Sequence, residues 1–129
     1  MFLRIVSLIW IALLALQGCQ PGQAQTHHNK SVRQTHEQVG TIEKNQLPRE
    51  AHEVLRAIQL GGPFAYDRDG VVFGNFERVL PQQVRGYYHE YTVKTPGAHN
   101  RGARRIISGE PGEYYYSADH YQTFQRIQE

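Results

Sequence analysis

The sequence predicts a small α+β domain in which an N-terminal helix packs on an antiparallel β-sheet of four to five strands. One apolar stripe at helical spacing comes first, and several short apolar or alternating segments follow, each bounded by Gly, Pro or Asp turn residues. The chain has 129 residues, which is enough for one domain of ordinary size. Its 40% hydrophobic and 20% charged residues are typical of a globular protein.

Charge and cysteine content exclude three features. The formal net charge is only +2, which is too small for a protein that holds nucleic acid by bulk charge alone, so any positive surface must be local. One cysteine excludes an internal disulfide framework and a zinc site built on several cysteines. The domain therefore depends on its apolar core, and we expect modest stability.

An apolar leader opens the chain. Residues 5–16 are almost entirely Ile, Val, Leu, Trp and Ala. As a helix this run would reach about 18 Å, short of a ~30 Å hydrocarbon core, so we expect 1–18 to be a signal peptide rather than a short membrane anchor. The segment Leu-Gln-Gly-Cys at 16–19 resembles the lipobox of bacterial lipoproteins, which makes Cys19 the expected lipidation site. Ordinary cleavage near Ala24 is the alternative, and both predict export.

The region after the leader is predicted to be a tether. Residues 20–37 are rich in Gln, His, Asn and Thr, so we expect 19–39 to be a lipidated Cys with a flexible tether and 40–129 to be the folded domain. His27 and His28 are interpreted as solvated, because no third ligand lies at helical or strand spacing, and no metal site is expected. The protein would then be a membrane-anchored lipoprotein, or secreted or periplasmic.

A helix is expected after Leu47. Pro48 suits the first helical turn, and Glu50 suits the positive end of the helix dipole. The Gly-Gly-Pro segment at 61–63 should end the helix. Four apolar residues recur at i, i+3, i+4 and i+7 and form one stripe that should face the sheet: Ala51, Val54, Leu55 and Ile58.

Four segments next to turn residues are predicted to be strands: 71–73, 87–95, 104–108 and 114–117. The clearest is 87–95, where alternation places Tyr91 and Val93 on one face. Glu90 falls on the opposite face of the same strand.

Four side chains on or beside these strands point to one chemistry. Glu90 lies mid-strand, Arg101 and Arg105 lie near the start of the next strand, and His120 follows the last. Each alone is commonly just a solvated or structural group. Together they supply what metal-independent RNA cleavage needs: a carboxylate to take the 2′-OH proton, an imidazole to protonate the leaving 5′-oxygen, and guanidinium groups for the charge gathering at phosphorus.

Several separated motifs then occur in one order: Gly-Pro-Phe at 62–64, Asp-Gly-Val-Val-Phe at 69–73, Gly-Tyr-Tyr-His-Glu-Tyr-Thr-Val at 86–93, Arg-Gly-Ala-Arg-Arg-Ile-Ile at 101–107 and Tyr-Tyr-Ser-Ala-Asp-His-Tyr at 115–121. This pattern closely resembles the secreted bacterial guanyl-specific ribonucleases, the barnase-like microbial ribonuclease family. The resemblance covers Gly40 to about Ile127, which is essentially the whole folded part.

The resemblance implies a role for each group. Glu90 would be the general base and His120 the general acid, while Arg101 and Arg105 would bind the phosphate and the transition state. Tyr121 resembles the family tyrosine that touches the phosphate. The implied reaction forms a 2′,3′-cyclic phosphate by transesterification and then hydrolyses it to a 3′-phosphate, with no metal or other cofactor.

The segment at 73–77 resembles the family's guanine-recognition loop. Backbone N–H groups of Asn75, Phe76 and Glu77 would meet guanine O6, and Phe73 would bound the base pocket. The Glu77 carboxylate would accept from N1–H and the exocyclic amine. An acceptor-only carboxylate suits guanine, whose Watson–Crick edge offers two adjacent donors, and does not suit adenine.

Departures from the family pattern affect the expected partners. Relatives commonly carry Arg where this chain has Phe76, so a cation near the phosphate path is lost. This weakens the expected attraction for RNA and for a barstar-like protein inhibitor, because charge steers association in the complex of the related barnase with its inhibitor. The lipid anchor at Cys19 and its tether are additions that place the enzyme at a membrane. We expect a monomer.

Two other functions remain open. A non-catalytic lipoprotein module that binds RNA or protein on a ribonuclease scaffold is supported only by Phe76. A glycosidase using Glu77 and Glu90 is weaker, because nothing in the sequence sets the distance between them and uncharged sugars need no arginine cluster.

Overall fold

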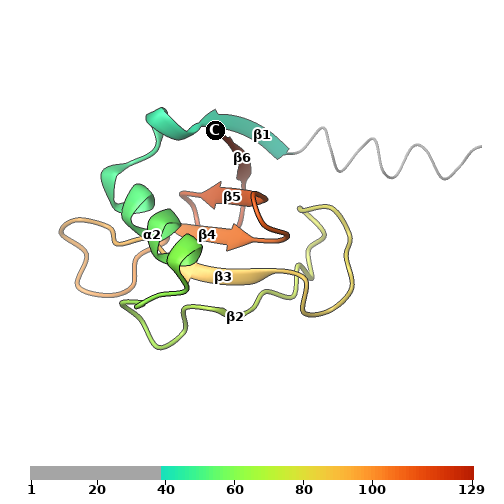
Figure 1. Cartoon of the computed structure of the whole chain (residues 1–129), viewed down its shortest axis with the longest axis horizontal. Helices are drawn as coiled ribbons and strands as arrows, with labels where there is room; N and C mark the ends of the chain where they lie inside the picture. The colour runs from blue at the N-terminus through green and yellow to red at the C-terminus, as the bar shows by residue number, and fades with distance from the viewer. Residues whose placement is uncertain (1–38) are drawn as a thin grey trace, which may run out of the picture.

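The structure is a computed structural model, and it describes residues 39–129. Within these residues, one α-helix and six strands form an α+β domain, with the strands in the order β1-β6-β5-β4-β3-β2 across one sheet (Figure 1). No helix in this part of the chain is long and apolar enough to cross a membrane. The elements are β1 (Val39–Glu43), the 3-10 turn η1 (Lys44–Gln46), α2 (Arg49–Leu60), β2 (Val71–Val72), β3 (His89–Thr92), β4 (Arg105–Ser108), β5 (Tyr114–Ser117) and β6 (Phe124–Gln128).

The predicted fold class is confirmed, but the expected four to five antiparallel strands are wrong. The sheet has six strands and is mixed, because β1 pairs with β6 in parallel while every other pair is antiparallel. A strand therefore also precedes the helix. β1 and β6 each carry only two large apolar residues among polar ones and glycine, so their pairing, rather than a local pattern, defines them.

The helix forms as the sequence predicts. Ala51 N–H and His52 N–H donate to Pro48 O, so the proline lies just before the first turn. At the other end, Gly61 adopts φ +77° and its N–H donates to Ile58 O. Glycine reaches this left-handed conformation without a steric penalty, which explains why the helix ends there.

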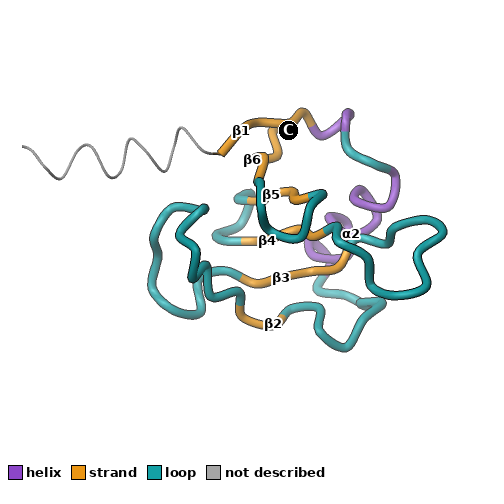
Figure 2. The backbone as a smooth tube through the Cα atoms, turned by 180° about the vertical axis from the view of Figure 1, so that it is seen from behind, coloured by secondary structure: helices purple, strands orange, loops and turns teal. Residues whose placement is uncertain are grey.

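Two apolar clusters lie on opposite faces of the sheet. The first joins α2, through Ala51 and Leu55, to Val93 and Ile106. The second joins Tyr88, Ile107, Tyr115 and Phe124 to residues of the loops, which border this face in the view from behind (Figure 2). The helix therefore leaves the second face open to a site built from strands and loops.

The central strand is shorter than predicted. β3 covers His89–Thr92 instead of 87–95, because Gly86 has φ +91° and Tyr87 still belongs to a turn. Tyr87 consequently packs beside Tyr88 in the second cluster and does not alternate with it. From His89 onward the alternation holds, and Glu90 pairs with Ile107 on the face away from the helix.

Candidate active site

A cavity of about 380 Å³ lies on the face of the sheet opposite α2. It is bordered by β2, the loop that follows it, β3 and the turn after β5. Seven of the nine site residues expected from the sequence line this one cavity: Phe73, Asn75, Phe76, Glu77, Glu90, His120 and Tyr121. The other two do not line it but contact residues that do, Arg101 through Glu90 and Arg105 through Tyr121.

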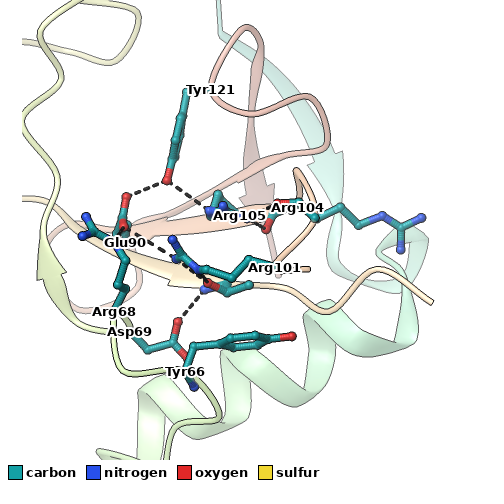
Figure 3. A network of polar contacts seen from close by, with 10 residues as sticks. Tyr66, Arg68, Asp69, Glu90, Arg101, Arg104, Arg105 and Tyr121 are labelled. Carbon is teal, nitrogen blue, oxygen red and sulfur yellow. Dashed lines mark hydrogen bonds and ion pairs between the residues drawn. The ribbon is translucent and has the colours of Figure 1, made fainter. Parts of the chain in front are cut away.

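Glu90 lies at the centre of the site and is only 7% exposed. Tyr121 Oη donates to Glu90 Oε2 at 2.5 Å, and two guanidinium groups approach Oε1 (Figure 3). Arg68 Nε lies 3.5 Å and Arg101 Nη2 lies 3.7 Å from that oxygen. A buried carboxylate is stable as an anion only when it is paired and hydrogen-bonded, and these contacts supply both conditions.

The two predicted arginines are held in fixed directions. Arg101 donates to Thr92 Oγ1 from Nε at 3.0 Å and from Nη2 at 2.5 Å. Arg105 is 3% exposed, and its Nε donates to Tyr121 Oη at 3.1 Å. Its Nη1 donates to the backbone oxygens of Gly102 and Arg104, both at 2.8 Å. Fixed guanidinium groups stabilise developing negative charge without reorganising during the reaction.

Tyr121 connects Glu90 to Arg105 through one hydroxyl, which donates to the first and accepts from the second. Burial and the neighbouring Glu90 carboxylate raise the pKa of Tyr121 above its ordinary value, while Arg105 opposes part of this shift. The hydroxyl therefore keeps its proton at neutral pH and remains a donor to the carboxylate.

His120 lies on a constrained turn after β5. His120 and Tyr121 have φ values of +58° and +72°, a region that costs free energy for residues other than glycine. Asp119 holds this turn, because its carboxylate accepts from Ser117 Oγ, Thr123 N–H and Thr123 Oγ1. Burial opposes the charged form of Asp119, but these hydrogen bonds outweigh it and lower its pKa.

The His120 ring is placed between two parts of the site. It is exposed, lines the cavity beside Glu90, and also borders the loop that carries Arg101. Its backbone N–H donates to Ala103 O at 3.1 Å, and its ring centroid lies 4.7 Å from that of Tyr121. A substrate in the cavity can therefore reach a carboxylate and an imidazole that do not contact each other.

The expected recognition loop forms one wall of the cavity. Asn75 adopts φ +48°, and its side chain turns inward, accepting from Leu80 N–H and donating to Leu80 O. Asn75 thus fixes the shape of the loop. Phe76 is 85% exposed at the cavity rim, and its ring lies over Gly74, where a Cβ would collide with it. Glu77 is exposed and lines the cavity.

Phe73 packs between the cavity and two aromatic rings of the second apolar cluster. Its ring lies 5.1 Å from that of Tyr121 in a stacked arrangement and 6.0 Å from that of Phe124. Because it lines the cavity and is partly buried, it offers an apolar surface to a ligand and also positions Tyr121.

Three residues at the site were not found from the sequence: Arg68, Asp69 and Thr92. Arg68 pairs with Glu90, Thr92 Oγ1 binds Arg101, and Asp69 Oδ1 accepts from Thr92 N–H at 2.7 Å. The only local signal for them is the charged Asp-Arg-Asp-Gly turn before β2. Its position beside Glu90 follows from the pairing of Val71 with Glu90, which no sequence pattern reveals.

These groups can perform acid–base chemistry at a bound phosphate. They combine one buried carboxylate, one exposed imidazole and two arginines directed by other protein groups. Within residues 39–129, no group of three His, Cys, Asp or Glu side chains is placed to hold a metal ion. The predicted lipidation site, Cys19, lies outside the described residues.

Known proteins resemble this chain in sequence and in structure. It is 58% identical over 89 residues to guanyl-specific ribonuclease Sa of Kitasatospora aureofaciens, covering 68% of this chain and 93% of that protein. It is 56% identical over 90 residues to guanyl-specific ribonuclease Sa3 of the same organism, covering 69% of this chain and 64% of that longer protein. Solved complexes of ribonuclease Sa2 with mononucleotides align at a TM-score of 0.69 and 48% identity, over 70% of this chain and 95% of theirs.

A family model described as ribonuclease matches residues 29–128, which is most of the chain. The motifs that carried the resemblance in the sequence include Glu90 and His120, which line the cavity, and Arg101, which lies 3.7 Å from Glu90 Oε1. The resemblance inferred from the sequence is confirmed, and the chain belongs to the ribonuclease family.

Proposed function

We propose that the protein is an exported, guanyl-preferring endoribonuclease that cleaves single-stranded RNA without a metal ion. One observation carries the proposal. The buried Glu90 carboxylate and the His120 imidazole line one cavity, whose wall is the loop containing Glu77. The relatives named guanyl-specific ribonucleases support both the reaction and the base preference.

In the first step, Glu90 takes the proton from the ribose 2′-OH as that oxygen attacks phosphorus. His120 gives a proton to the departing 5′-oxygen, and a 2′,3′-cyclic phosphate forms. Arg101 and Arg105 stabilise the negative charge on the phosphoryl oxygens, because their side chains are already directed by Thr92 and Tyr121. Each positioned acid or base contributes about 10²–10⁴-fold to such a rate.

In the second step, water opens the cyclic phosphate to a 3′-phosphate. The roles reverse, since His120 now takes a proton from water and Glu90 returns one to the 2′-oxygen. This reversal requires both groups to reach the same phosphorus. Their positions on separate elements, β3 and the turn after β5, permit an approach from two sides.

The recognition loop would select guanine. Its backbone N–H groups at 75–77 would meet O6, and the Glu77 carboxylate would accept from the two donors on the Watson–Crick edge. Phe73 provides an apolar surface for the base, and stacking of a base on an aromatic ring contributes about 1–3 kcal/mol. Asn75 contributes by holding the loop through Leu80.

A dinucleotide assay tests the reaction. The protein should cleave guanylyl-3′,5′-cytidine, and the double variant Glu90→Gln, His120→Gln should not. If the unmodified protein cleaves no faster than the double variant while binding RNA, it is a non-catalytic binding module. The pH profile of kcat/KM should be bell-shaped, since base and acid must be in opposite protonation states. A flat profile between about pH 4 and pH 9 would exclude these roles.

Base preference is tested by Glu77→Ala. This variant should lose the preference for guanine over adenine and still cleave slowly, because Glu77 is exposed at the cavity wall and takes no part in the proton transfers. Guanine selectivity that survives the substitution would show that another group reads the base.

Export, the signal peptide at 1–18, the lipidation of Cys19 and the 19–39 tether stay predictions, because they concern residues outside or at the edge of the described part. Mass spectrometry of the mature N-terminus distinguishes a diacylated Cys19 from cleavage near Ala24. A barstar-like inhibitor and the monomeric state are likewise proposals, which binding assays and solution mass measurements test.

A further inference from the structure

Arg68 is held differently from the other arginines near Glu90. Its Nε faces Glu90 Oε1 at 3.5 Å while its side chain is 63% exposed, and within residues 39–129 its guanidinium has no second ion pair or hydrogen bond. Arg101 binds Thr92 Oγ1 through two nitrogens, and the buried Arg105 donates to three oxygens. Arg68 is therefore the least constrained of the three cations.

The backbone that carries Arg68 is, by contrast, tied to β3. Gly70 N–H donates to Glu90 O at 2.8 Å, and the Asp69 carboxylate accepts from Thr92 N–H at 2.7 Å (Figure 3). Arg68 also lines the cavity. A long side chain on a fixed backbone can reach either the carboxylate or a ligand beside it.

We propose that Arg68 is an exchangeable cation, which pairs with Glu90 in the free enzyme and moves to an RNA phosphate when substrate binds. The inference rests on the proposed ribonuclease function. While Arg68 faces Glu90, its positive charge partly neutralises that buried carboxylate. When it leaves, this partial neutralisation is lost and the carboxylate is free to take the 2′-OH proton. The guanidinium meanwhile gains a phosphate contact.

The other charged and titratable groups around Glu90 keep their places in this exchange. Tyr121 donates to Oε2 and is itself bound by Arg105. Arg101 Nη2 lies 3.7 Å from Glu90 Oε1 and is held there by its hydrogen bonds to Thr92 Oγ1. His120 lines the same cavity. Arg68 alone would thus change the charge at the carboxylate between the free and bound enzyme.

The test compares Arg68→Gln with Arg56→Gln, which removes the same charge from an exposed position on α2, on the opposite face of the sheet. In Arg68→Gln the acid limb of the kcat/KM profile, which reports the free enzyme, should move up by roughly 0.2–0.7 pH units, the range for a partly exposed ion pair. The acid limb of kcat, which reports the bound enzyme, should not move. Arg68→Lys, which keeps the charge, should restore the kcat/KM limb.

Salt dependence tests the second half of the exchange. On a single-stranded oligonucleotide, the slope of log kcat/KM against log salt should lose about 0.7 in Arg68→Gln, the value for one fewer phosphate contact. Equal profiles in Arg68→Gln and Arg56→Gln, or equal shifts of both limbs with an unchanged salt slope, would overturn the exchange. An unmodified protein that does not cleave RNA would instead overturn the proposed function itself.

Discussion

At the scale of single residues, the hydroxyl of Tyr121 is the contact on which two other groups depend. It donates to Glu90 and accepts from Arg105, so its removal leaves a buried carboxylate oxygen without a donor and a buried guanidinium nitrogen without an acceptor. Leaving a buried polar group unpaired costs about 1–3 kcal/mol. The Tyr121→Phe variant should therefore lower the free energy of unfolding by about 1–3 kcal/mol. It should also lower kcat/KM, because Glu90 and Arg105 lose the contact that directs them.

The matched control is Tyr116→Phe, which removes a hydroxyl from a buried tyrosine of the first apolar cluster, on the α2 face of the sheet. Steady-state cleavage of guanylyl-3′,5′-cytidine measures both variants, and circular dichroism confirms that each is folded. Similar activity in the two variants would mean that Tyr121 only fills space beneath the site.

Sequence reasoning identified the chemistry of single residues better than their partners. Strand alternation correctly placed Glu90 on the face away from Val93. It could not show that Tyr121 reaches Glu90, because that contact depends on left-handed backbone at two successive residues after β5. Nor could it show that Arg68 pairs with Glu90, because that contact follows from the register of β2 against β3.

At the scale of elements, the loop between β3 and β4 positions both predicted arginines through Gly102. This glycine has φ +64°, its carbonyl accepts from Arg105, and a Cβ there would lie 2.8 Å from Thr95 Cβ. The Gly102→Ala variant combines an unfavourable φ with a collision, so it should lower the free energy of unfolding by about 2–4 kcal/mol. It should also reduce cleavage, because Arg101 precedes it directly.

Gly97 offers the control within the same loop. Its φ is +79°, but nothing lies within 4 Å of a Cβ at that position. Gly97→Ala therefore carries only the backbone penalty of about 1–2 kcal/mol. Urea unfolding of the two variants separates the effects, and equal losses of stability would mean that the loop shifts to accept the extra methyl group at Gly102.

The elements that sequence reasoning found are those with a strong local pattern. The apolar face of α2 and the end of the helix at Gly61 were predictable, because helical periodicity and helix capping depend on residues only a few positions apart. β1 and β6 were missed, because each is defined by a partner far along the chain, as in the pairs Val39 with Phe124 and Ile42 with Ile127. Parallel pairing of the first and last strands of the domain leaves no turn signal to detect.

At the scale of the whole molecule, the second apolar cluster, on the face of the sheet away from α2, contains tyrosines whose hydroxyls donate to protein acceptors. Tyr88 Oη donates to Pro81 O at 2.9 Å, and Tyr115 Oη donates to Glu113 Oε1 at 2.7 Å. Burial raises the pKa of Tyr115 to about 12, and burial also raises the pKa of Tyr88. Tyr121, in the site itself, shifts in the same direction.

These shifts predict that the protein loses stability in alkali. In the unfolded chain these tyrosines release their protons at about pH 10. In the folded protein Tyr115 retains its proton to about pH 12, and the pKa values of Tyr88 and Tyr121 are raised in the same direction. Between these values the unfolded state binds fewer protons, so the free energy of unfolding must fall as pH rises, and their contribution is fully present only below about pH 10. Urea unfolding at a series of pH values should show a midpoint that declines above about pH 10. Tyr115→Phe, which has no proton to lose there, should decline less steeply, and a parallel decline in both proteins would assign the loss to other groups.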